Sequence, residues 1–380
     1  MSSDVTGPAA SNYLPYTSGV KAYFDAVNGK GGINGRKVNV VVLDDQSQAP
    51  KGVSNYRRFV TQTPALAFTG LNSTQQSAVA AQSRANNLPF VGSIVTGADM
   101  MKPFNKNFYS LACTYPDQAE VAVAFMVEQL GLAAPRIMTS QTPVASGNEW
   151  ASVVKELVQK AGGTLVANHV TEYGALNEDV FGRDVADKKP DMLIAHGATS
   201  TAQVTMKSLA KFGVKNLPIG TAAVLQDGSV PATAPGVVNS YYAFNCYTAP
   251  GAAGADGEPL IAAAKAAGLE AKVYDRPEFT QGYTIAMVMA KAIEGAGDRP
   301  TRDAVQQQLD KLNELDNGAL SPAVTFSPDD HVGIAGVRPY KYNPSSGAFE
   351  PVGEFDDYAG CLTNYYVTRS LDSWNKDCIK

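Results

Sequence analysis

Short apolar runs alternate along this chain with segments of helical spacing, and this alternation limits the folds that the chain can adopt. The runs at 37–43, 66–69 and 89–92 have the length and composition of buried strands. Between them, the segments 55–63 and 74–86 have the pattern of helices. Strands that alternate with helices are joined by crossovers, so this order predicts a mostly parallel sheet with helices on both faces.

The same alternation begins again after residue 117. Helices are predicted over 118–130, 149–161, 203–212, 281–295 and 302–312, and strands over 136–139, 164–170, 192–195 and 217–220. A chain of 380 residues also exceeds what a single hydrophobic core usually serves. We therefore expect two α/β domains of similar design.

The glycine-rich segment GKGGINGR at 29–36 looks at first like a phosphate-binding loop. A GxGxxG loop needs a strand before it and a helix after it. Here a helical segment precedes the glycines, a strand follows them, and Asn34 stands where the third glycine belongs. We interpret the segment as the end of a helix with a turn into a strand, and we reject a nucleotide site.

Composition excludes several classes of function. The chain is 44% hydrophobic and 18% charged, as in ordinary globular proteins, and its net charge is −5 without a basic cluster, so nucleic acid is not expected as a partner. No apolar run approaches the length of a membrane helix. Residues 1–4 lack the basic start and apolar core of a signal peptide, which leaves a cytoplasmic protein or the mature form of an exported one.

The four cysteines are Cys113, Cys246, Cys361 and Cys378. None of them has CxxC spacing, so a zinc site or thioredoxin-like chemistry is not predicted. Cys361 and Cys378 bracket a short loop near the end of the chain, and we expect a disulfide there; the alternative is two free thiols. Such a bridge would contribute ~3 kcal/mol and would favour an exported protein.

A series of motifs in a fixed order resembles one protein family. They are Thr6-Gly7-Pro8, Gly19, Asn28 with the block 31–36, Asp44-Asp45, Gly70 with Ser73-Thr74, Pro89, Thr96, Ser146-Gly147 and Gly162. The chain resembles the type I periplasmic binding proteins, in particular the branched-chain amino acid cluster of ABC-transporter solute-binding proteins. The block from Asn28 to Arg36 is the most specific of these motifs.

The resemblance implies two doubly wound, Rossmann-like lobes with mostly parallel sheets, joined by a three-stranded hinge, with a ligand cleft between them that hinge closure shuts. Lobe one would comprise residues 1–117 plus 249–328, and lobe two residues 118–248 plus 329–380. The family's first strand should precede Thr6, where only Val5 is apolar. We expect that strand to be shortened or incomplete.

In similar proteins a serine or threonine at a helix start in lobe one receives the ligand carboxylate, and Ser73 and Thr74 occupy that place. The start of a helix also presents amide groups and the positive end of a dipole to an anion. Ser73 could instead act only as the helix N-cap, and the two roles are compatible. Val95 and Thr96 match the neighbouring ligand loop of the family.

The resemblance implies further ligand contacts. Asn12 and Tyr13 lie in the first loop, where the family has an aromatic or polar wall. In lobe two the candidates are Ser146, Asn148, His196 and Thr199. A lone histidine is as often a satisfied structural residue, so both roles stay open for His196.

Ala222 is the main departure from the family. Amino-acid binders usually have an acidic residue near this position, which pairs with the ligand ammonium, whereas residues 219–224 contain none. A buried ammonium without a carboxylate partner is costly. We therefore expect a ligand with a carboxylate and without an α-amino group, such as an aliphatic or aromatic acid. Asp227, five residues on, could replace the missing acid.

These observations predict an extracytoplasmic solute-binding protein of an ABC importer, which would present its ligand to a membrane permease. It would be periplasmic or attached to the cell surface, without a cofactor or metal. A ligand-sensing receptor of the same fold is the alternative. An enzyme is not expected, because the chain lacks GxSxG and HExxH motifs and has three scattered histidines.

Overall fold

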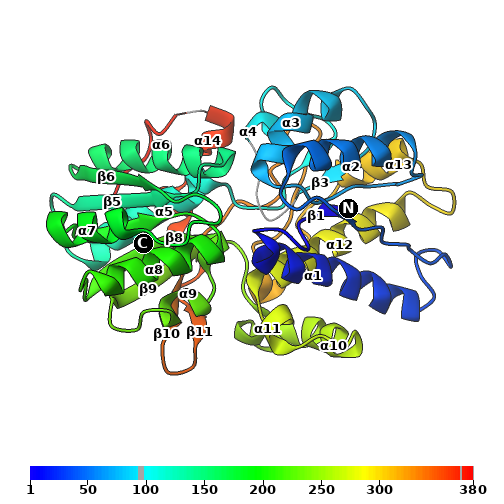
Figure 1. The fold of residues 1–380 in the computed structure, drawn as a ribbon. Helices are drawn as coiled ribbons and strands as arrows, with labels where there is room; N and C mark the ends of the chain where they lie inside the picture. The colour runs from blue at the N-terminus through cyan, green and yellow to red at the C-terminus, as the bar shows by residue number, and fades with distance from the viewer. Residues whose placement is uncertain (93–97, 369, 380) are drawn as a thin grey trace. The chain divides into compact units, whose positions relative to one another are not determined.

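The computed structural model describes residues 1–92, 98–368 and 370–379. The chain divides into two compact units, of which unit 1 comprises Met1–Ala112 and Tyr247–Ala335, and unit 2 comprises Cys113–Cys246 and Gly336–Lys380. The chain therefore passes from one unit to the other three times. Each unit has helices packed around a largely parallel sheet, so the predicted α/β fold class is confirmed (Figure 1).

The sheet of unit 1 is built from very short parallel pairings. Strand β1 (Ser2–Ser3) pairs with β2 (Leu43–Asp44), and β3 (Phe90–Val91) pairs with β4 (Phe108–Tyr109). Single bridges from Ser2 to Gly70 and from Phe68 to Phe90 join these pairs into one sheet. Tyr56, Phe68, Phe90 and Phe108 meet at aromatic distances and fill its core.

The helices of unit 1 are α1 (Ala10–Gly29), α2 (Ala49–Thr61), α3 (Ser73–Arg84), α4 (Ala98–Met101), α10 (Glu258–Ala266), α11 (Ala271–Tyr274), α12 (Pro277–Gly295) and α13 (Arg302–Leu309). Helices α1 and α12 lie along each other on one side of the sheet, and α2 and α3 lie on the other side (Figure 1). A Cβ atom at Gly19 would stand 2.2 Å from the Phe279 carbonyl oxygen, and one at Gly282 would stand 2.1 Å from that of Tyr16. These two glycines therefore permit the close crossing of α1 and α12.

The glycine-rich turn behaves as its sequence predicts. Helix α1 ends at Gly29, and Gly31 and Gly32 follow with φ angles of 105° and 85°, which favour glycine. The strand predicted over 37–43 is wrong for residues 37–42, because pairing begins only at Leu43. The reason is that β1, its neighbour, is only two residues long, so the earlier residues have no strand beside them.

Unit 2 contains one seven-stranded sheet in the order β11-β10-β9-β8-β7-β5-β6. Its strands are β5 (Arg136–Gln141), β6 (Thr164–Val170), β7 (Met192–Ala195), β8 (Leu217–Ala222), β9 (Val238–Asn245), β10 (Arg338–Asn343) and β11 (Ala348–Pro351). The strands from β5 to β9 pair in parallel, whereas β10 and β11 add an antiparallel edge.

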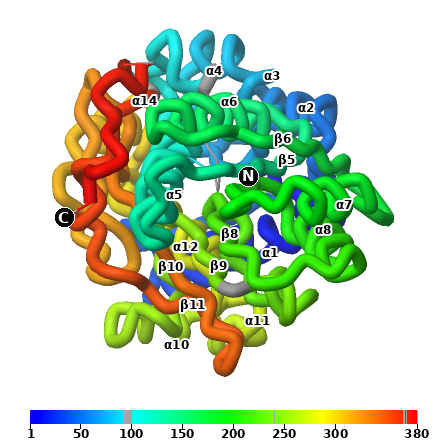
Figure 2. The backbone as a smooth tube through the Cα atoms, turned by 90° about the vertical axis from the view of Figure 1, so that its left-hand side faces the viewer, coloured from blue at the N-terminus to red at the C-terminus, as the bar shows by residue number. Residues whose placement is uncertain are grey.

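The helices of unit 2 are α5 (Tyr115–Gln129), α6 (Ala145–Lys160), α7 (Asp179–Lys188), α8 (Thr199–Lys211), α9 (Ser229–Ala232) and α14 (Tyr365–Thr368). Helices α5 and α6 lie on one face of the sheet, and α7 and α8 lie on the other, as Figure 2 shows from the side of this unit. Every residue of α5 from Tyr115 to Val127 is buried. This helix is therefore covered on the side away from the sheet as well.

The end of the chain supplies that cover. The backbone amide of Thr363 donates to the Glu120 carboxyl group at 2.7 Å, and the Trp374 indole donates to the Glu120 carbonyl oxygen at 3.2 Å. Cys361 is paired with Cys378 in a disulfide, which confirms the bridge predicted from the sequence. A second disulfide, which sequence spacing did not suggest, joins Cys113 to Cys246 across 133 residues of sequence.

Candidate ligand-binding site

In unit 1, the candidate residues at the start of α3 follow an unusual turn. Gly70 and Leu71 have φ angles of 111° and 67°, and a Cβ atom at Gly70 would stand 1.7 Å from the Ser2 carbonyl oxygen. A left-handed conformation is unfavourable for leucine, and such residues cluster at functional sites. The turn leads directly from the stretch 68–70, which is bridged to the sheet, into helix α3.

Asn72, and not Ser73, caps helix α3. The Asn72 side chain accepts a hydrogen bond from the Gln75 amide at 2.9 Å, and the Gln75 side chain accepts one from the Asn72 amide at 2.9 Å. The prediction that Ser73 is the N-cap is therefore wrong, because the asparagine before it forms the complete capping box. Ser73 is buried in the first turn and Thr74 is exposed beside it. Their hydroxyl groups are not needed for capping.

The other residues of unit 1 that were predicted as ligand contacts are Asn12, Tyr13, Val95 and Thr96. Asn12 is buried in α1 and donates to the Glu278 carboxylate at 2.9 Å, and Glu278 forms an ion pair with Arg276 at 3.0 Å. Tyr13 is buried with its ring edge-on to Tyr16, at 6.3 Å between ring centres. A ligand role for Asn12 and Tyr13 stays a prediction. Val95 and Thr96 lie outside the described residues.

In unit 2, polar side chains gather at the carboxyl ends of β5 and β7, where open α/β sheets bind ligands. Thr142 follows β5, and His196 follows β7. A Cβ atom at Gly147, in the first turn of α6, would stand 2.1 Å from the Thr142 carbonyl oxygen and 3.3 Å from Nδ1 of His196. Glycine at this position therefore lets the start of α6 pack directly against both strand ends.

His196 is neutral and has unused hydrogen-bonding capacity. Its side chain is 5% exposed, and burial lowers the pKa of its imidazole to about 3. Its ring stands edge-on to Tyr115, at 4.7 Å between ring centres, and is tilted against Trp150 at 6.2 Å. Within the described part of the chain, neither ring nitrogen has a hydrogen-bond partner. A neutral imidazole offers one donor and one acceptor, and both are buried without a partner in the described structure.

Three residues near His196 also have a buried polar atom without a hydrogen-bond partner. The Oε1 atom of Gln141, the Oγ1 atom of Thr142 and the Nε1 atom of Trp150 are buried and have no partner among the described residues. A buried polar group without a partner costs about 1–3 kcal/mol. Several such groups at the ends of β5 and β7 and in the adjoining helix α6 are therefore unusual in a region that serves only packing. We call Gln141, Thr142, Trp150 and His196 the polar cluster of unit 2.

The residues predicted as ligand contacts in lobe two differ in their burial and in their contacts. Ser146 is buried in the first turn of α6 beside Gly147, whereas Asn148 is exposed. Thr199 begins α8 and donates to the Asp227 carboxylate at 3.1 Å. Residue identity alone did not single out Gln141, Thr142 or Trp150. Their place after a predicted strand could have suggested the first two, because strand ends of a parallel sheet form the binding edge.

Ala222 and Asp227 bear on the ligand charge. Ala222 is fully buried at the carboxyl end of β8 and offers no charge. Asp227 is 9% exposed, and its carboxylate accepts hydrogen bonds from the Thr199 hydroxyl and, at 3.0 Å, from the Ser229 amide. This carboxylate is therefore already engaged by its own unit. The polar cluster itself contains no charged group.

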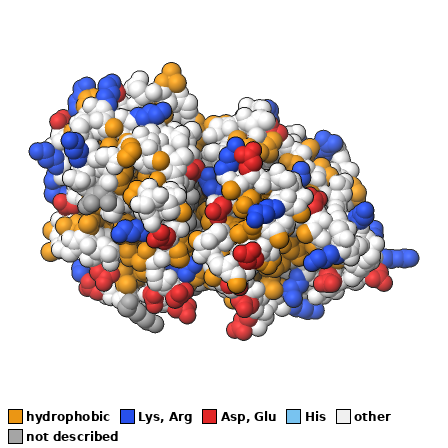
Figure 3. Space-filling view, turned by 90° about the horizontal axis from the view of Figure 1, so that it is seen from below, with side chains coloured by type: hydrophobic (Ala, Val, Ile, Leu, Met, Phe, Trp, Pro, Cys, Tyr) orange, Lys and Arg blue, Asp and Glu red, His pale blue; other side chains and the backbone are white. Residues whose placement is uncertain are grey.

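Unit 2 thus presents polar side chains at the carboxyl ends of parallel strands, where open α/β sheets bind ligands. Lys and Arg side chains are interspersed with Asp and Glu on the face shown in Figure 3, as the net charge of −5 leads one to expect. The chain belongs to the periplasmic binding protein family, whose sequence profile matches residues 1–348. The resemblance read from the sequence is thereby confirmed.

Solved structures show the same fold at low sequence identity. A branched-chain amino acid ABC transporter protein from Thermus thermophilus with bound valine has a TM-score of 0.83 and 17% identity, covering 93% of this chain and 94% of that one. A fatty acid ABC transporter substrate-binding protein from Thermomonospora curvata has a TM-score of 0.80 and 19% identity, with coverages of 94% and 92%.

A third solved structure is a solute-binding protein from R. palustris in complex with benzoate. It has a TM-score of 0.74 and 17% identity, with coverages of 93% and 94%. A comparison with curated protein sequences found no match. Among the described residues, no helix combines the length and hydropathy that a membrane-spanning segment requires.

Proposed function

We propose that this protein is an extracytoplasmic solute-binding protein of an ABC importer. In this proposal the two units act as lobes that close on a small carboxylate-bearing ligand, and the closed form is presented to a membrane permease. The protein would act by binding and not by catalysis. The observation that carries the proposal is the polar cluster of unit 2, whose buried atoms lack partners at the strand ends where this fold holds ligands.

The ligand proposed for this site is an aliphatic or aromatic acid without an α-amino group. A buried ammonium needs an acidic partner, but Ala222 offers none and Asp227 is engaged by Thr199 and Ser229. The neutral His196 also adds no charge. The start of α3, with Ser73 and Thr74, would receive the ligand carboxylate. Solved structures of this fold whose descriptions name a fatty acid transporter and bound benzoate support this proposal.

The two disulfides support a location outside the cytoplasm. Disulfides persist in oxidising compartments and are rare in the cytosol. Here Cys113 is paired with Cys246 and Cys361 with Cys378, which leaves no free cysteine in the described chain. Together with the family, this favours a periplasmic or cell-surface protein.

A ligand screen tests the proposed class. Thermal shift and calorimetry would compare benzoate and straight-chain fatty acids with leucine and valine, because a ligand specific for the folded state raises its stability. We expect the organic acids to bind and the amino acids to bind at least about tenfold more weakly. Tight binding of leucine or valine with no response to organic acids would contradict the proposed ligand class.

A matched pair of variants on β5 and at its end tests the site itself. Thr142→Val removes a buried hydroxyl that has no partner, so it should stabilise the free protein by about 1 kcal/mol and weaken ligand binding. Thr139→Val removes a hydroxyl that donates to the Ile194 carbonyl oxygen at 2.7 Å, so it should destabilise the protein without changing affinity. Equal effects of the two variants on affinity would argue against the polar cluster as the site.

A further inference from the structure

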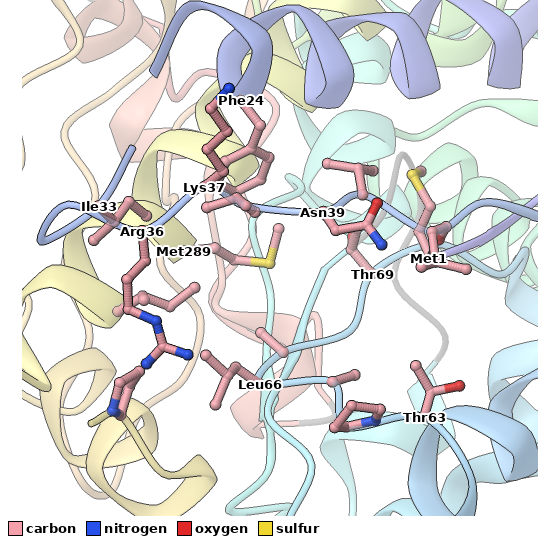
Figure 4. Close-up of a pocket in the computed structure, with 18 of the residues that line it drawn as sticks. Met1, Phe24, Ile33, Arg36, Lys37, Asn39, Thr63, Leu66, Thr69 and Met289 are labelled. Carbon is pink, nitrogen blue, oxygen red and sulfur yellow. Dashed lines mark hydrogen bonds between the residues drawn. The ribbon is translucent and has the colours of Figure 1, made fainter. Parts of the chain in front are cut away.

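A pocket of about 630 Å³ in unit 1 has mainly apolar walls. Met289 is one of its apolar side chains, and Arg36 and Thr69 are among its polar ones (Figure 4). Arg36 donates to the Asp298 carbonyl at 3.2 Å, and the Thr69 hydroxyl donates to the carbonyl of Gly92. Among the described residues that line this pocket, no side chain has a buried polar atom without a partner. Its walls therefore do not require a polar ligand group, in contrast to the polar cluster of unit 2.

The polar cluster lies at the ends of neighbouring strands, and backbone hydrogen bonds hold these ends together. The His196 amide donates to the Ser140 carbonyl at 2.8 Å, which places the end of β7 beside that of β5. The Thr171 amide donates to the Gln141 carbonyl at 2.8 Å, which places the end of β6 on the other side of β5. Thr171 is 2% exposed, and its hydroxyl is a further buried group without a partner among the described residues. Unpaired polar atoms therefore extend over three adjacent strand ends.

The unpaired atoms include both donors and acceptors. The Nε1 atom of Trp150 can only donate a hydrogen bond, and the Oε1 atom of Gln141 can only accept one. The neutral imidazole of His196 offers one donor and one acceptor, and the hydroxyl groups of Thr142 and Thr171 can act as either. A ligand group that satisfies this edge of the sheet must therefore donate as well as accept.

This requirement distinguishes between the groups that an organic ligand can offer. A carboxylate accepts hydrogen bonds and donates none, so it would leave the acceptor nitrogen of His196 and the Oε1 atom of Gln141 unpaired. It would also bring a buried charge to a cluster that contains no charged group, which is costly. A hydrocarbon would pair with none of these atoms. A hydroxyl or carboxamide group donates, accepts and carries no charge.

We propose that the ligand is an organic acid with a hydroxyl or carboxamide group at the end away from its carboxylate, and that the polar cluster binds this neutral group. This assignment rests on the proposed function, in which Ser73 and Thr74 at the start of α3 receive the carboxylate. It narrows the ligand class from aliphatic and aromatic acids in general to hydroxy and amide acids. Trp150 and His196, whose ring centres are 6.2 Å apart, are the specificity-determining residues.

The test compares matched acids by calorimetry on the full chain. Benzoate is compared with meta-hydroxybenzoate, para-hydroxybenzoate and para-carbamoylbenzoate, and octanoate with its analogue that carries a terminal hydroxyl. Terephthalate places a second carboxylate where the other acids have the neutral group. We expect the best hydroxyl or amide acid to bind at least about tenfold more tightly than its parent acid and than terephthalate, because a site built for a polar group rejects a ligand that leaves its buried groups unpaired.

The outcomes separate this assignment from the proposed function. If benzoate or octanoate binds and no hydroxyl or amide acid binds more tightly than its parent, the assignment of a neutral polar group is overturned, while the proposed binding of organic acids stands. Terephthalate as the tightest ligand would also overturn it. If none of the acids binds, the proposed ligand class itself fails, and the narrower assignment fails with it.

Variants of the two aromatic residues test the contact directly. Trp150→Phe removes the indole donor and keeps an aromatic ring, so the advantage of the best hydroxyl or amide acid over its parent should fall at least about fivefold. His196→Phe should reduce the same ratio. The matched control is Trp374→Phe, which removes an indole that donates to the Glu120 carbonyl and should leave the ratio unchanged. A loss of packing would lower both affinities alike, so an unchanged ratio in both Trp150→Phe and His196→Phe would overturn the proposal.

Discussion

The carboxyl group of Glu120 makes the stability of unit 2 depend on pH. Glu120 lies in the middle of α5 and is fully buried, where its two oxygens accept from the amide of Thr363 at 2.7 Å and contact its hydroxyl at 2.6 Å. Burial, and then the charge of Asp117, raise the pKa of this carboxyl group to about 8 from 4.5. The folded protein therefore holds a proton that the unfolded chain releases near pH 4.5.

The sign of the effect follows from this difference. A group whose pKa is raised by folding contributes its full stability below the pKa of the unfolded chain, and the contribution is lost as pH rises through about 8. A difference of 8 − 4.5 = 3.5 between the two values corresponds to ~5 kcal/mol at ~1.4 kcal/mol per pKa unit. The neighbouring Asp117 carboxyl shares part of this effect, because burial also raises its pKa. We therefore expect roughly 2–4 kcal/mol from Glu120 itself.

Glu120→Gln should remove this dependence. A glutamine amide can accept from the Thr363 amide and donate to the Thr363 hydroxyl, so the variant keeps both contacts without a titrating group. Urea unfolding would be measured from pH 4.5 to pH 9 by tryptophan fluorescence. Both tryptophans of the chain, Trp150 and Trp374, lie in unit 2 and report on it.

The wild-type protein should lose stability relative to Glu120→Gln across this range, and most of the loss should fall between pH 5 and pH 8. Glu128→Gln, on the exposed end of the same helix, is the matched control and should follow the wild type. If the free energies of unfolding of the wild type and Glu120→Gln stay parallel from pH 4.5 to pH 9, the assignment of the titrating group is refuted.

Three further perturbations have defined outcomes. Arg302→Ala removes donors to the carbonyl of Phe59 within α2 and to that of Ala65 after it, so calorimetry should show unit 1 destabilised by about 2–3 kcal/mol. Arg302→Lys should cost less, and equal losses would exclude a role for the guanidinium geometry. Cys378→Ser removes the disulfide to Cys361 and should lower the free energy of unfolding in urea by ~3 kcal/mol. Reductant should cause no further loss that stems from this bridge. Ser73→Ala combined with Thr74→Ala should weaken binding of the organic acid that responds best in the screen by about tenfold or more in calorimetry, and unchanged affinity would move the carboxylate site away from α3.

The fold could be predicted from the sequence because its signals are local. Alternating apolar runs predict the α/β order, and the glycines after Gly29 end α1 and turn the chain as expected. The strand over 37–43 could not be predicted in its true extent, because a strand exists only where a neighbour pairs with it. The disulfide between Cys113 and Cys246 is invisible for a similar reason, since the tertiary fold alone brings together residues 133 positions apart.

The candidate site could be predicted only in outline. Ser73 is predicted from the family resemblance and its place at a helix start, and His196 from its place after a strand; a ligand contact at either residue stays a prediction. Asn72 was missed as the N-cap of α3, because serine and asparagine are both preferred at that position. The capping box that Asn72 forms with Gln75 decides in favour of the asparagine. Gln141 and Thr142 were missed because β5 runs two residues beyond the predicted end at residue 139, which places them at the binding edge.

The helix starts of unit 2 differ in their capping. Helix α5 begins with a full capping box between Thr114 and Asp117, whereas the residues before α6 and α8 are Val144 and Ala198, whose side chains have no polar atom. A missing cap costs a helix about 1 kcal/mol. The capped helix lies in the packed interior, and the two without a polar capping side chain start at the strand ends that carry Thr142 and His196. Helix α8 keeps part of a capping box, because the Ala198 amide donates to the Thr201 hydroxyl at 3.1 Å. Helices α1, α2 and α12 of unit 1 also begin without a side-chain cap, so an uncapped start does not by itself mark a binding site. This edge of the sheet is therefore distinguished by its buried polar atoms, which have no partner among the described residues.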